Sequence, residues 1–146
     1  MIDVRRMTGI AELTAKNRLY AEVFGDEYSY AGDPPGDAYL ARLLADPHFI
    51  ALGAWDGERL VGALSAYVLR KYERERSEAY IYDLAVAETH RRQGVATALI
   101  EALKPIAREG GAWVIFVQAD YGDDPAVALY EKLGVREEVL HFDISV

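Results

Sequence analysis

The stretch from residue 80 to residue 96 constrains the fold more than any other part of the chain. Residues 80–86 are aromatic, β-branched and apolar apart from Asp83, which predicts a strand buried on at least one face. A short polar turn follows, and an apolar pattern of helical spacing begins after Gly94. That pattern consists of Val95, Leu99, Ile100 and Leu103. The sequence therefore predicts a strand, a tight loop and the first turn of a helix in direct succession.

The loop of this unit is suited to phosphate oxygens. The first N–H groups of a helix have no partner within the helix, and the helix dipole is positive at that end. Arg91 and Arg92 add two full positive charges at the same place. Taken alone the pattern is a weak signal, because a solvated first turn of a helix has a similar composition.

Strand and helix patterns alternate along the rest of the chain. Strands are predicted for residues 2–6, 48–55, 59–69, 112–119 and 135–144. Helices are predicted after Thr8, from Asp37, over residues 92–108 and from Pro125 to Gly134. This order predicts a mixed α/β sheet, and 146 residues suit a single domain, residues 1–146.

Several local signals refine these elements. Gly62 inside a strand predicts a bulge or a close backbone approach. Pro105 predicts that the helix over residues 92–108 is kinked or shortened. The polar, Gly- and Pro-rich stretch 26–36 predicts a loop that is either a plain connection or a rim for a polycationic ligand. The candidate rim residues are Glu27, Tyr28, Tyr30 and Asp33.

Composition narrows the class of function. The absence of cysteine excludes disulfides, a thiol nucleophile and cysteine metal sites, and the three histidines lack metal-ligand spacing, so we expect no metal. The net charge of −8 argues against nucleic-acid binding. It suits a cationic partner, although acidity also serves solubility. The N-terminus lacks a signal-peptide pattern and no apolar run has membrane-spanning length, so we expect a cytoplasmic protein without membrane contact.

The loop and a second block, residues 123–135, together resemble the GNAT superfamily of N-acetyltransferases. The family's pyrophosphate loop, Arg/Gln-x-x-Gly-x-Gly/Ala, is matched by Arg91, Gly94 and Ala96. The family's later helix motif is matched by Ala126, Leu129, Tyr130, Lys132 and Gly134. Asp123 replaces the usual Asn of that motif, and Val135 replaces the usual Phe. The resemblance implies a mixed, mostly antiparallel central sheet flanked by helices, with splayed central strands.

Within the superfamily, the chain after residue 37 looks similar to the type I aminoglycoside 3-N-acetyltransferases. The similar segments are residues 49–52, 61–64, 66–69, 80–86, 90–94, 117–130, 136–139 and 141–144. This implies transfer of acetyl from acetyl-coenzyme A to the 3-amino group of an aminoglycoside such as gentamicin, which confers antibiotic resistance. A polyamine or other small-amine acetyltransferase and a non-catalytic acyl-coenzyme A sensor remain alternatives. Members of the superfamily often pair, so a homodimer is a further expectation.

The resemblance also assigns roles to residues. Those expected to hold the cofactor are Leu84, Ala85, Val86, Arg91, Arg92, Gln93, Gly94, Val95, Ala96 and Thr97. Tyr130 is expected to be the general acid toward the departing thiolate. Those expected to contact the cationic substrate are Tyr82, Asp83, Asp120, Glu138 and Asp143. Asp123 is expected to cap the following helix, because an ionised Asp cannot donate the hydrogen bond of the usual Asn.

Asp83 is the candidate catalytic residue that the chain itself singles out. A carboxylate in an otherwise apolar strand costs free energy unless it is paired or takes part in chemistry. We expect it to hold the substrate ammonium and to act as general base, directly or through water. The alternative is a structural partner to an arginine or a backbone group.

Overall fold

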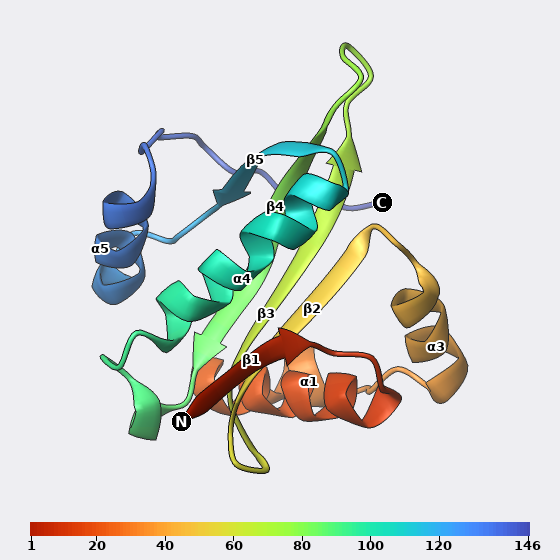
Figure 1. Cartoon of the computed structure of the whole chain (residues 1–146), viewed down its shortest axis with the longest axis vertical. Helices are drawn as coiled ribbons and strands as arrows, with labels where there is room; N and C mark the ends of the chain where they lie inside the picture. Colours follow the sequence, from red (N-terminus) through yellow and green to blue (C-terminus); the bar gives the residue numbers. More distant parts are fainter. The chain divides into compact units, whose positions relative to one another are not determined.

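Five strands form one sheet at the centre of the fold. The computed structural model describes all residues, Met1–Val146. The sheet has the order β1-β2-β3-β4-β5, and the pairs from β1 to β4 are antiparallel. The strands are β1 (Ile2–Arg6), β2 (Phe49–Asp56), β3 (Arg59–Arg70), β4 (Ser77–Val86) and β5 (Ala112–Val117). The predicted mixed, mostly antiparallel sheet is confirmed (Figure 1).

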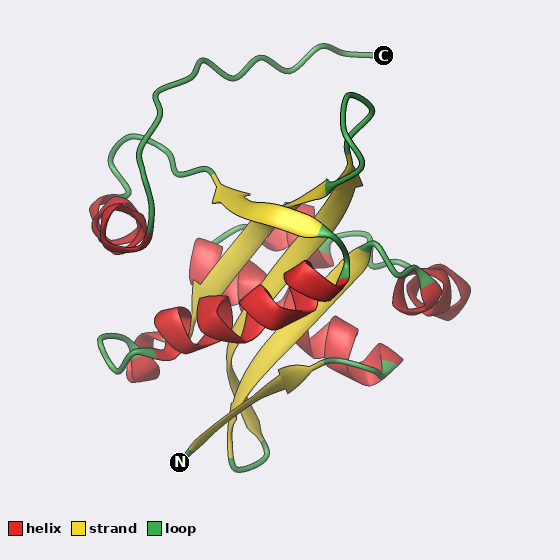
Figure 2. Ribbon diagram, turned by 45° about the horizontal axis from the view of Figure 1, so that its top comes forward, coloured by secondary structure: helices red, strands yellow, loops and turns green.

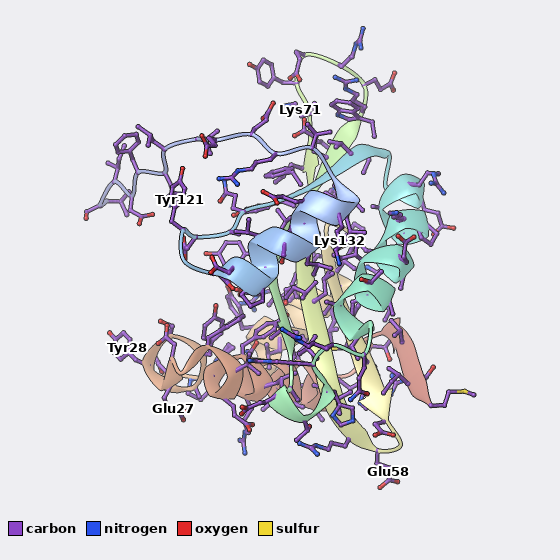
Figure 3. The ribbon with its side chains drawn as sticks, turned by 90° about the vertical axis from the view of Figure 1, so that its left-hand side faces the viewer. Glu27, Tyr28, Glu58, Lys71, Tyr121 and Lys132 are labelled. Atoms are coloured by element: carbon purple, nitrogen blue, oxygen red, sulfur yellow. The ribbon has the colours of Figure 1, made fainter.

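Six helical segments accompany the sheet. They are α1 (Ile10–Phe24), α2 (Glu27–Ala31), α3 (Asp37–Ala45), the 3-10 turn η1 (Glu88–His90), α4 (Val95–Glu109) and α5 (Asp124–Leu133). Helix α4 crosses one face of the sheet, and α1 with α2 lies on the other (Figures 2 and 3). The chain divides into two compact units, Met1–Phe116 and Val117–Val146, which are described separately.

The core of the first unit lies between the sheet and its helices. Strand β2 is buried along seven of its eight residues, and α4 turns one apolar stripe inward. Its most deeply buried side chains include Leu52, Leu64, Leu99 and Leu103. The stripe predicted from the spacing of apolar residues in the sequence is therefore the buried face of α4.

Gly62 brings α4 close to the sheet. A Cβ atom at this position would lie 2.8 Å from Val95 Cγ1 and 3.3 Å from Leu99 Cδ1. Only a residue without a side chain allows this contact between β3 and the first turn of α4. Both alternatives predicted for Gly62 are observed, because α4 approaches it closely and a bulge lies beside it: Ala54 pairs with Gly62 whereas Trp55 pairs with Leu60, so Val61 is the extra residue.

Strand β4 carries a bulge at its centre. Ser65 of β3 pairs with Asp83, whereas the next residue, Ala66, pairs with Ile81, so Tyr82 is the extra residue. Consecutive side chains of a regular strand point to opposite faces of the sheet, and a bulge breaks this alternation. The bulge therefore changes the direction of the side chains at Tyr82 and Asp83.

Four local predictions are wrong. The stretch 26–36 contains the short helix α2, because Asp26 accepts a hydrogen bond from the Ser29 N–H at 3.0 Å and caps it. Gly9, not Thr8, is the N-cap of α1, and Gly36, not Asp37, is that of α3. Helix α4 runs through Pro105 to Glu109, so the predicted shortening is wrong, while the alternative of a kink stays a prediction. Because Pro105 is eleventh in the helix, only its own missing N–H is lost, and the flanking turns continue.

The predicted strand over residues 135–144 is also wrong. Residues 134–146 form no helix or strand, and the apolar side chains among them are exposed. Alternation of apolar and polar residues describes one face of a strand, but a strand also needs a neighbouring backbone to bond with. The pattern carries no information about that neighbour.

Candidate active site

A pocket of about 220 Å³ opens on the face of the sheet that α1 covers. It lies within the first unit and is lined by residues of α1, α2, α3 and strands β2, β3 and β4. Six of the lining side chains are aromatic: Tyr20, Tyr30, Tyr39, Phe49, Tyr67 and Tyr82. Asp83 is the only carboxylate among the lining residues, and Lys16 is the only cation. The pocket therefore suits a ligand that presents one positive charge and apolar ring surface.

The bulge in β4 places both Tyr82 and Asp83 on this pocket. As consecutive residues of a regular strand they would face opposite sides of the sheet. The extra residue lets both side chains line one cavity, with Tyr82 more than half exposed and Asp83 partly buried. Two of the predicted substrate residues are thus together in the structure.

Hydrogen bonds reach both the carboxylate and the main-chain carbonyl of Asp83. The Tyr30 hydroxyl donates to Asp83 Oδ1 at 2.9 Å, and the Tyr20 hydroxyl approaches the Asp83 carbonyl oxygen at 3.5 Å. Tyr20 is itself hydrogen-bonded to Ser65 Oγ at 2.9 Å. Burial raises the pKa of Asp83, while the Tyr30 hydrogen bond and the positive charge of Lys16 oppose that rise. A carboxylate with a raised pKa and a fixed orientation suits a general base.

Lys16 is the second ionisable group of the pocket. Its side chain is buried, with only 6% of the residue exposed, and its Nζ donates to Asn17 Oδ1 at 2.9 Å. The ammonium also lies 4.9 Å from the centre of the Tyr20 ring. Burial lowers the pKa of Lys16 to about 8, although the charge of Asp83 acts in the opposite direction. Lys16 therefore exchanges its proton close to neutral pH.

The predicted phosphate loop has the geometry of an anion site. Arg92 and Gly94 adopt left-handed backbone conformations, with φ of 59° and 77°. Helix α4 begins at Val95 with no side-chain cap and no acidic residue in its first turn. The N–H groups of that turn and the exposed Arg91 and Arg92 are therefore available to phosphate oxygens. The residues present suit the pyrophosphate of coenzyme A, which as co-substrate would supply the acetyl thioester.

Hydrogen bonds hold this loop against the sheet. His90 Nε2 lies 2.9 Å from Asp56 Oδ2 in the turn between β2 and β3. Gln93 Nε2 donates to the Thr89 carbonyl at 3.4 Å, and Arg91 Nε donates to the Val86 carbonyl at 3.5 Å. Gln93 and Arg91 thus shape the loop, which the sequence alone did not indicate.

The end of β4 offers free backbone for a linear ligand. Strands β4 and β5 start at the same end, since the Ser77 N–H donates to the Gly111 carbonyl at 2.9 Å. Because β5 has six residues and β4 has ten, Leu84, Ala85 and Val86 extend beyond β5. The Ala85 side chain is buried while Leu84 and Val86 are partly exposed. Their role beside pantetheine stays a prediction.

The second unit carries the remaining predicted residues. Tyr130 lies on α5, and Asp123 caps that helix by accepting from the Ala126 N–H at 3.4 Å, as predicted. Glu138 pairs with Arg136 at 2.8 Å, and Asp143 pairs with His141 at 2.9 Å. Asp120 is exposed. The catalytic role of Tyr130 and the substrate roles of Asp120, Glu138 and Asp143 stay predictions.

Three residues that act on Asp83, namely Lys16, Tyr20 and Tyr30, were not predicted as pocket residues. Lys16 and Tyr20 belong to the helix after Thr8, where the spacing of Leu13, Lys16 and Tyr20 places all three on one buried stripe. A lysine within such a stripe was the available signal. Tyr30 was predicted only as a candidate rim residue. It turns into the pocket, whereas Glu27 and Tyr28 of the same helix point into solvent (Figure 3).

The chain is similar to solved aminoglycoside acetyltransferases. The chain is 53% identical to an aminoglycoside acetyltransferase from an uncultured soil metagenomic sample, with a TM-score of 0.97 over 100% of this chain and 99% of that one. A second such enzyme from an uncultured soil metagenomic sample, solved in complex with sisomicin, is 32% identical, with a TM-score of 0.91 over 99% and 96%.

Curated sequences are more distant. N-acetyltransferase 8B of Rattus norvegicus is 29% identical over 93 residues, which is 62% of this chain and 42% of that protein. N-alpha-acetyltransferase 30 of Schizosaccharomyces pombe is 33% identical over 99 residues, 66% of this chain and 61% of that protein. The chain spans less than two thirds of the length of these curated relatives.

The model of the acetyltransferase (GNAT) family matches residues 16–135, which include every pocket residue except Leu13, the phosphate loop and α5. None of the helices has the length and apolar character needed to cross a bilayer. The resemblance inferred from the two sequence motifs is thus confirmed at the level of the family. The chain belongs to the acetyltransferase (GNAT) family.

Proposed function

We propose that this chain is an acetyl-coenzyme A-dependent aminoglycoside N-acetyltransferase that modifies the 3-amino group, with gentamicin among its substrates. The observation that carries the proposal is the 53% identity, over the whole chain, to a solved aminoglycoside acetyltransferase. The pocket supports it, because aromatic walls around one carboxylate suit an amino sugar. The net charge of −8 adds long-range attraction for a polycation.

The proposed chemistry begins at Asp83. The carboxylate holds the substrate ammonium and takes one proton from it, directly or through one water, which frees the nitrogen lone pair. Tyr30 keeps Oδ1 oriented through its hydrogen bond, so the carboxylate presents its other oxygen to the amine. The amine nitrogen then attacks the thioester carbonyl carbon, and a backbone N–H near Leu84 or Ala85 stabilises the oxyanion. When the carbon–sulfur bond breaks, Tyr130 supplies a proton to the thiolate. The nitrogen releases its second proton through solvent, which restores the Tyr130 hydroxyl, and the proton on Asp83 passes to solvent.

The proposed reaction would weaken the binding of an aminoglycoside to RNA. Acetylation converts a cationic amine to a neutral amide, which removes one electrostatic contact that an aminoglycoside makes with RNA phosphate. A cytoplasmic location and an association of two copies fit this role and stay predictions. Light scattering at several protein concentrations tests the second.

The test is thiol release from acetyl-coenzyme A with gentamicin, kanamycin and spermidine, followed by mass spectrometry of the products. Acetylation of gentamicin at the 3-amino group supports the proposal. Turnover of spermidine alone points to a polyamine acetyltransferase, and coenzyme A binding without turnover of any amine points to a sensor.

Isosteric variants separate binding from chemistry. Asp83→Asn and Tyr130→Phe are each expected to leave coenzyme A binding unchanged and to lower kcat by about 10²-fold or more, the usual size of a general acid or base contribution. Calorimetry with coenzyme A and steady-state kinetics measure the two quantities. Full turnover in both variants contradicts the assigned roles.

A further inference from the structure

A buried lysine is unexpected in a pocket for a cationic substrate. Lys16 lies on α1 between Leu13 and Tyr20, which are both 1% exposed. Its Nζ has three hydrogens and donates one hydrogen bond, to Asn17 Oδ1. The aromatic rings of Tyr20 and Phe49 lie 4.9 and 6.0 Å from Nζ and supply weak cation–π attraction. These contacts therefore replace only part of the hydration that the ammonium loses on burial.

The groups that face Lys16 include a single anion. The titratable lining residues are Tyr20 from α1, Tyr30 from α2, Tyr39 from α3, Tyr67 from β3, and Tyr82 and Asp83 from β4. Burial raises the pKa of Tyr20, Tyr30 and Tyr67, so these three hydroxyls stay neutral. Asp83 is thus the only anion among the lining residues, and it acts on Lys16 through its charge rather than through a hydrogen bond.

This arrangement sets two cations against one carboxylate. A substrate ammonium that docks on Asp83 enters a low-dielectric pocket that already holds the Lys16 charge. Like charges a few ångströms apart in such a site repel strongly, and the usual response is that one group gives up its proton. Lys16 is the group that gives it up most readily, because burial already disfavours its charged form.

We propose that Lys16 is a specificity-determining residue whose ammonium competes with a substrate ammonium for Asp83, so that the substrate binds as Lys16 releases a proton to solvent. The inference rests on the proposed function for the identity of the substrate. The step is balanced: Lys16 goes from ammonium to neutral amine, one proton goes to buffer, and no covalent bond to the protein forms. The neutral amine then accepts a hydrogen bond from the bound amino sugar.

The proposal has a defined size. With a pKa of about 8, about one tenth of Lys16 is neutral at pH 7. When only that fraction binds substrate well, KM at pH 7 is about tenfold above its limit at high pH. The neutral fraction grows as pH rises through the pKa, so KM falls between pH 7 and pH 9. A substrate whose ring carries a hydroxyl instead of an ammonium near Lys16 escapes this effect.

The test compares Lys16→Met with the wild type. Methionine keeps the length of the side chain and suits the apolar surroundings. At pH 7 we expect the variant to show a KM for gentamicin about tenfold lower, with kcat little changed and no fall in KM toward pH 9. Calorimetry of gentamicin binding in two buffers of different ionisation enthalpy is expected to show release of nearly one proton at pH 7 for the wild type and none for the variant.

Controls keep the test specific. Lys104→Met removes a lysine from the exposed face of α4, where it pairs with Glu101 at 2.7 Å, and should reproduce the wild-type pH dependence. Lys16→Gln replaces the Met variant if circular dichroism shows that the latter does not fold. A KM profile of Lys16→Met or Lys16→Gln that follows the wild type overturns the proposal, as does binding without proton release in the wild type.

A ligand-free measurement separates this inference from the proposed function. NMR titration of the Lys16 side chain should give a pKa near 8, falling further in Asp83→Asn because Asp83 supports the charged form. A value near that of an ordinary lysine overturns the inference, even when gentamicin is acetylated. If no amine is acetylated, the proposed function fails, while a low Lys16 pKa that Asp83→Asn lowers still supports the competition of cations for Asp83.

Discussion

Replacing Tyr30 by Phe removes one hydroxyl from the candidate site and little else. That hydroxyl donates to Asp83 Oδ1 at 2.9 Å. The Tyr30 ring packs against Tyr20 and Phe24, with centroids 5.6 and 5.5 Å apart, and Phe retains those contacts. The variant therefore isolates the effect of one hydrogen bond on the candidate base.

The sign of the effect follows from the charge state that the hydrogen bond favours. A donor to a carboxylate stabilises the ionised form and lowers its pKa, so its loss raises the pKa of Asp83. Hydrogen bonds to charged groups contribute about 1.5–3 kcal/mol. Asp83 is only partly buried, so water replaces part of the lost hydrogen bond, and the expected loss is about half of that range. The remaining loss of about 0.8–1.5 kcal/mol in the free energy of the ionised form appears as a higher pKa of Asp83.

Two measurements check this value. Carboxyl carbon NMR gives the pKa of Asp83 directly, with its signal assigned by its absence from Asp83→Asn. The acidic limb of the kcat/KM profile should move to higher pH by the same amount, because activity is lost where the base becomes protonated. Tyr72→Phe, at a position 98% exposed in the turn between β3 and β4, should leave both unchanged. An Asp83 pKa in Tyr30→Phe that is unchanged or lower refutes the reasoning.

Two glycines give further predictions. Gly94→Val forces a branched residue into a backbone with φ of 77°, at a cost of about 1–3 kcal/mol, and should weaken coenzyme A binding by about tenfold in calorimetry. Gly57→Val, with φ of 62° in the turn between β2 and β3, should lower stability without changing that affinity; equal losses of affinity in both would speak against the loop as the phosphate site. Gly62→Val should lower the free energy of unfolding by about 1–3 kcal/mol, measured in urea, because its Cβ meets Val95 at 2.8 Å. Gly36→Ser, with no atom within 4 Å of its Cβ and a side chain suited to an N-cap, should be close to neutral, and a neutral Gly62→Val would mean that α4 does not approach β3 as described.

The sequence predicted what depends on short stretches of chain. The strand before Gly94, the loop and the apolar stripe of α4 are encoded within 24 consecutive positions, and the structure has all three. Asp83 was singled out because a lone carboxylate in an apolar strand needs a reason. Its neighbours were not predictable in the same way, since Tyr30 lies 53 positions away along the chain and Tyr20 lies 63. Only tertiary packing brings them together.

The errors also have physical causes. Residues 135–144 show the alternation of a strand, yet backbone pairing depends on a neighbour that local pattern does not reveal. Thr8 has the side chain of a good N-cap, but Glu12 accepts from the N–H groups of Thr8 and Gly9 at 3.0 and 3.1 Å and satisfies them first. In the first case the pattern lacks the neighbouring strand that it needs, and in the second Glu12 makes the hydrogen bonds at the helix start.

The extra residue in β4 divides that strand into two parts whose side chains have different surroundings. Before Tyr82, every second residue is buried, so its identity is limited by packing in the core. From Tyr82 onward the alternation starts again, and the side chains of Tyr82 and Asp83 line the pocket. Substitutions in one half therefore leave the orientation of the other unchanged, and relatives can diverge in substrate while keeping a common core. Deleting a single residue at Tyr82 would join the two phases and turn the carboxylate away from its pocket.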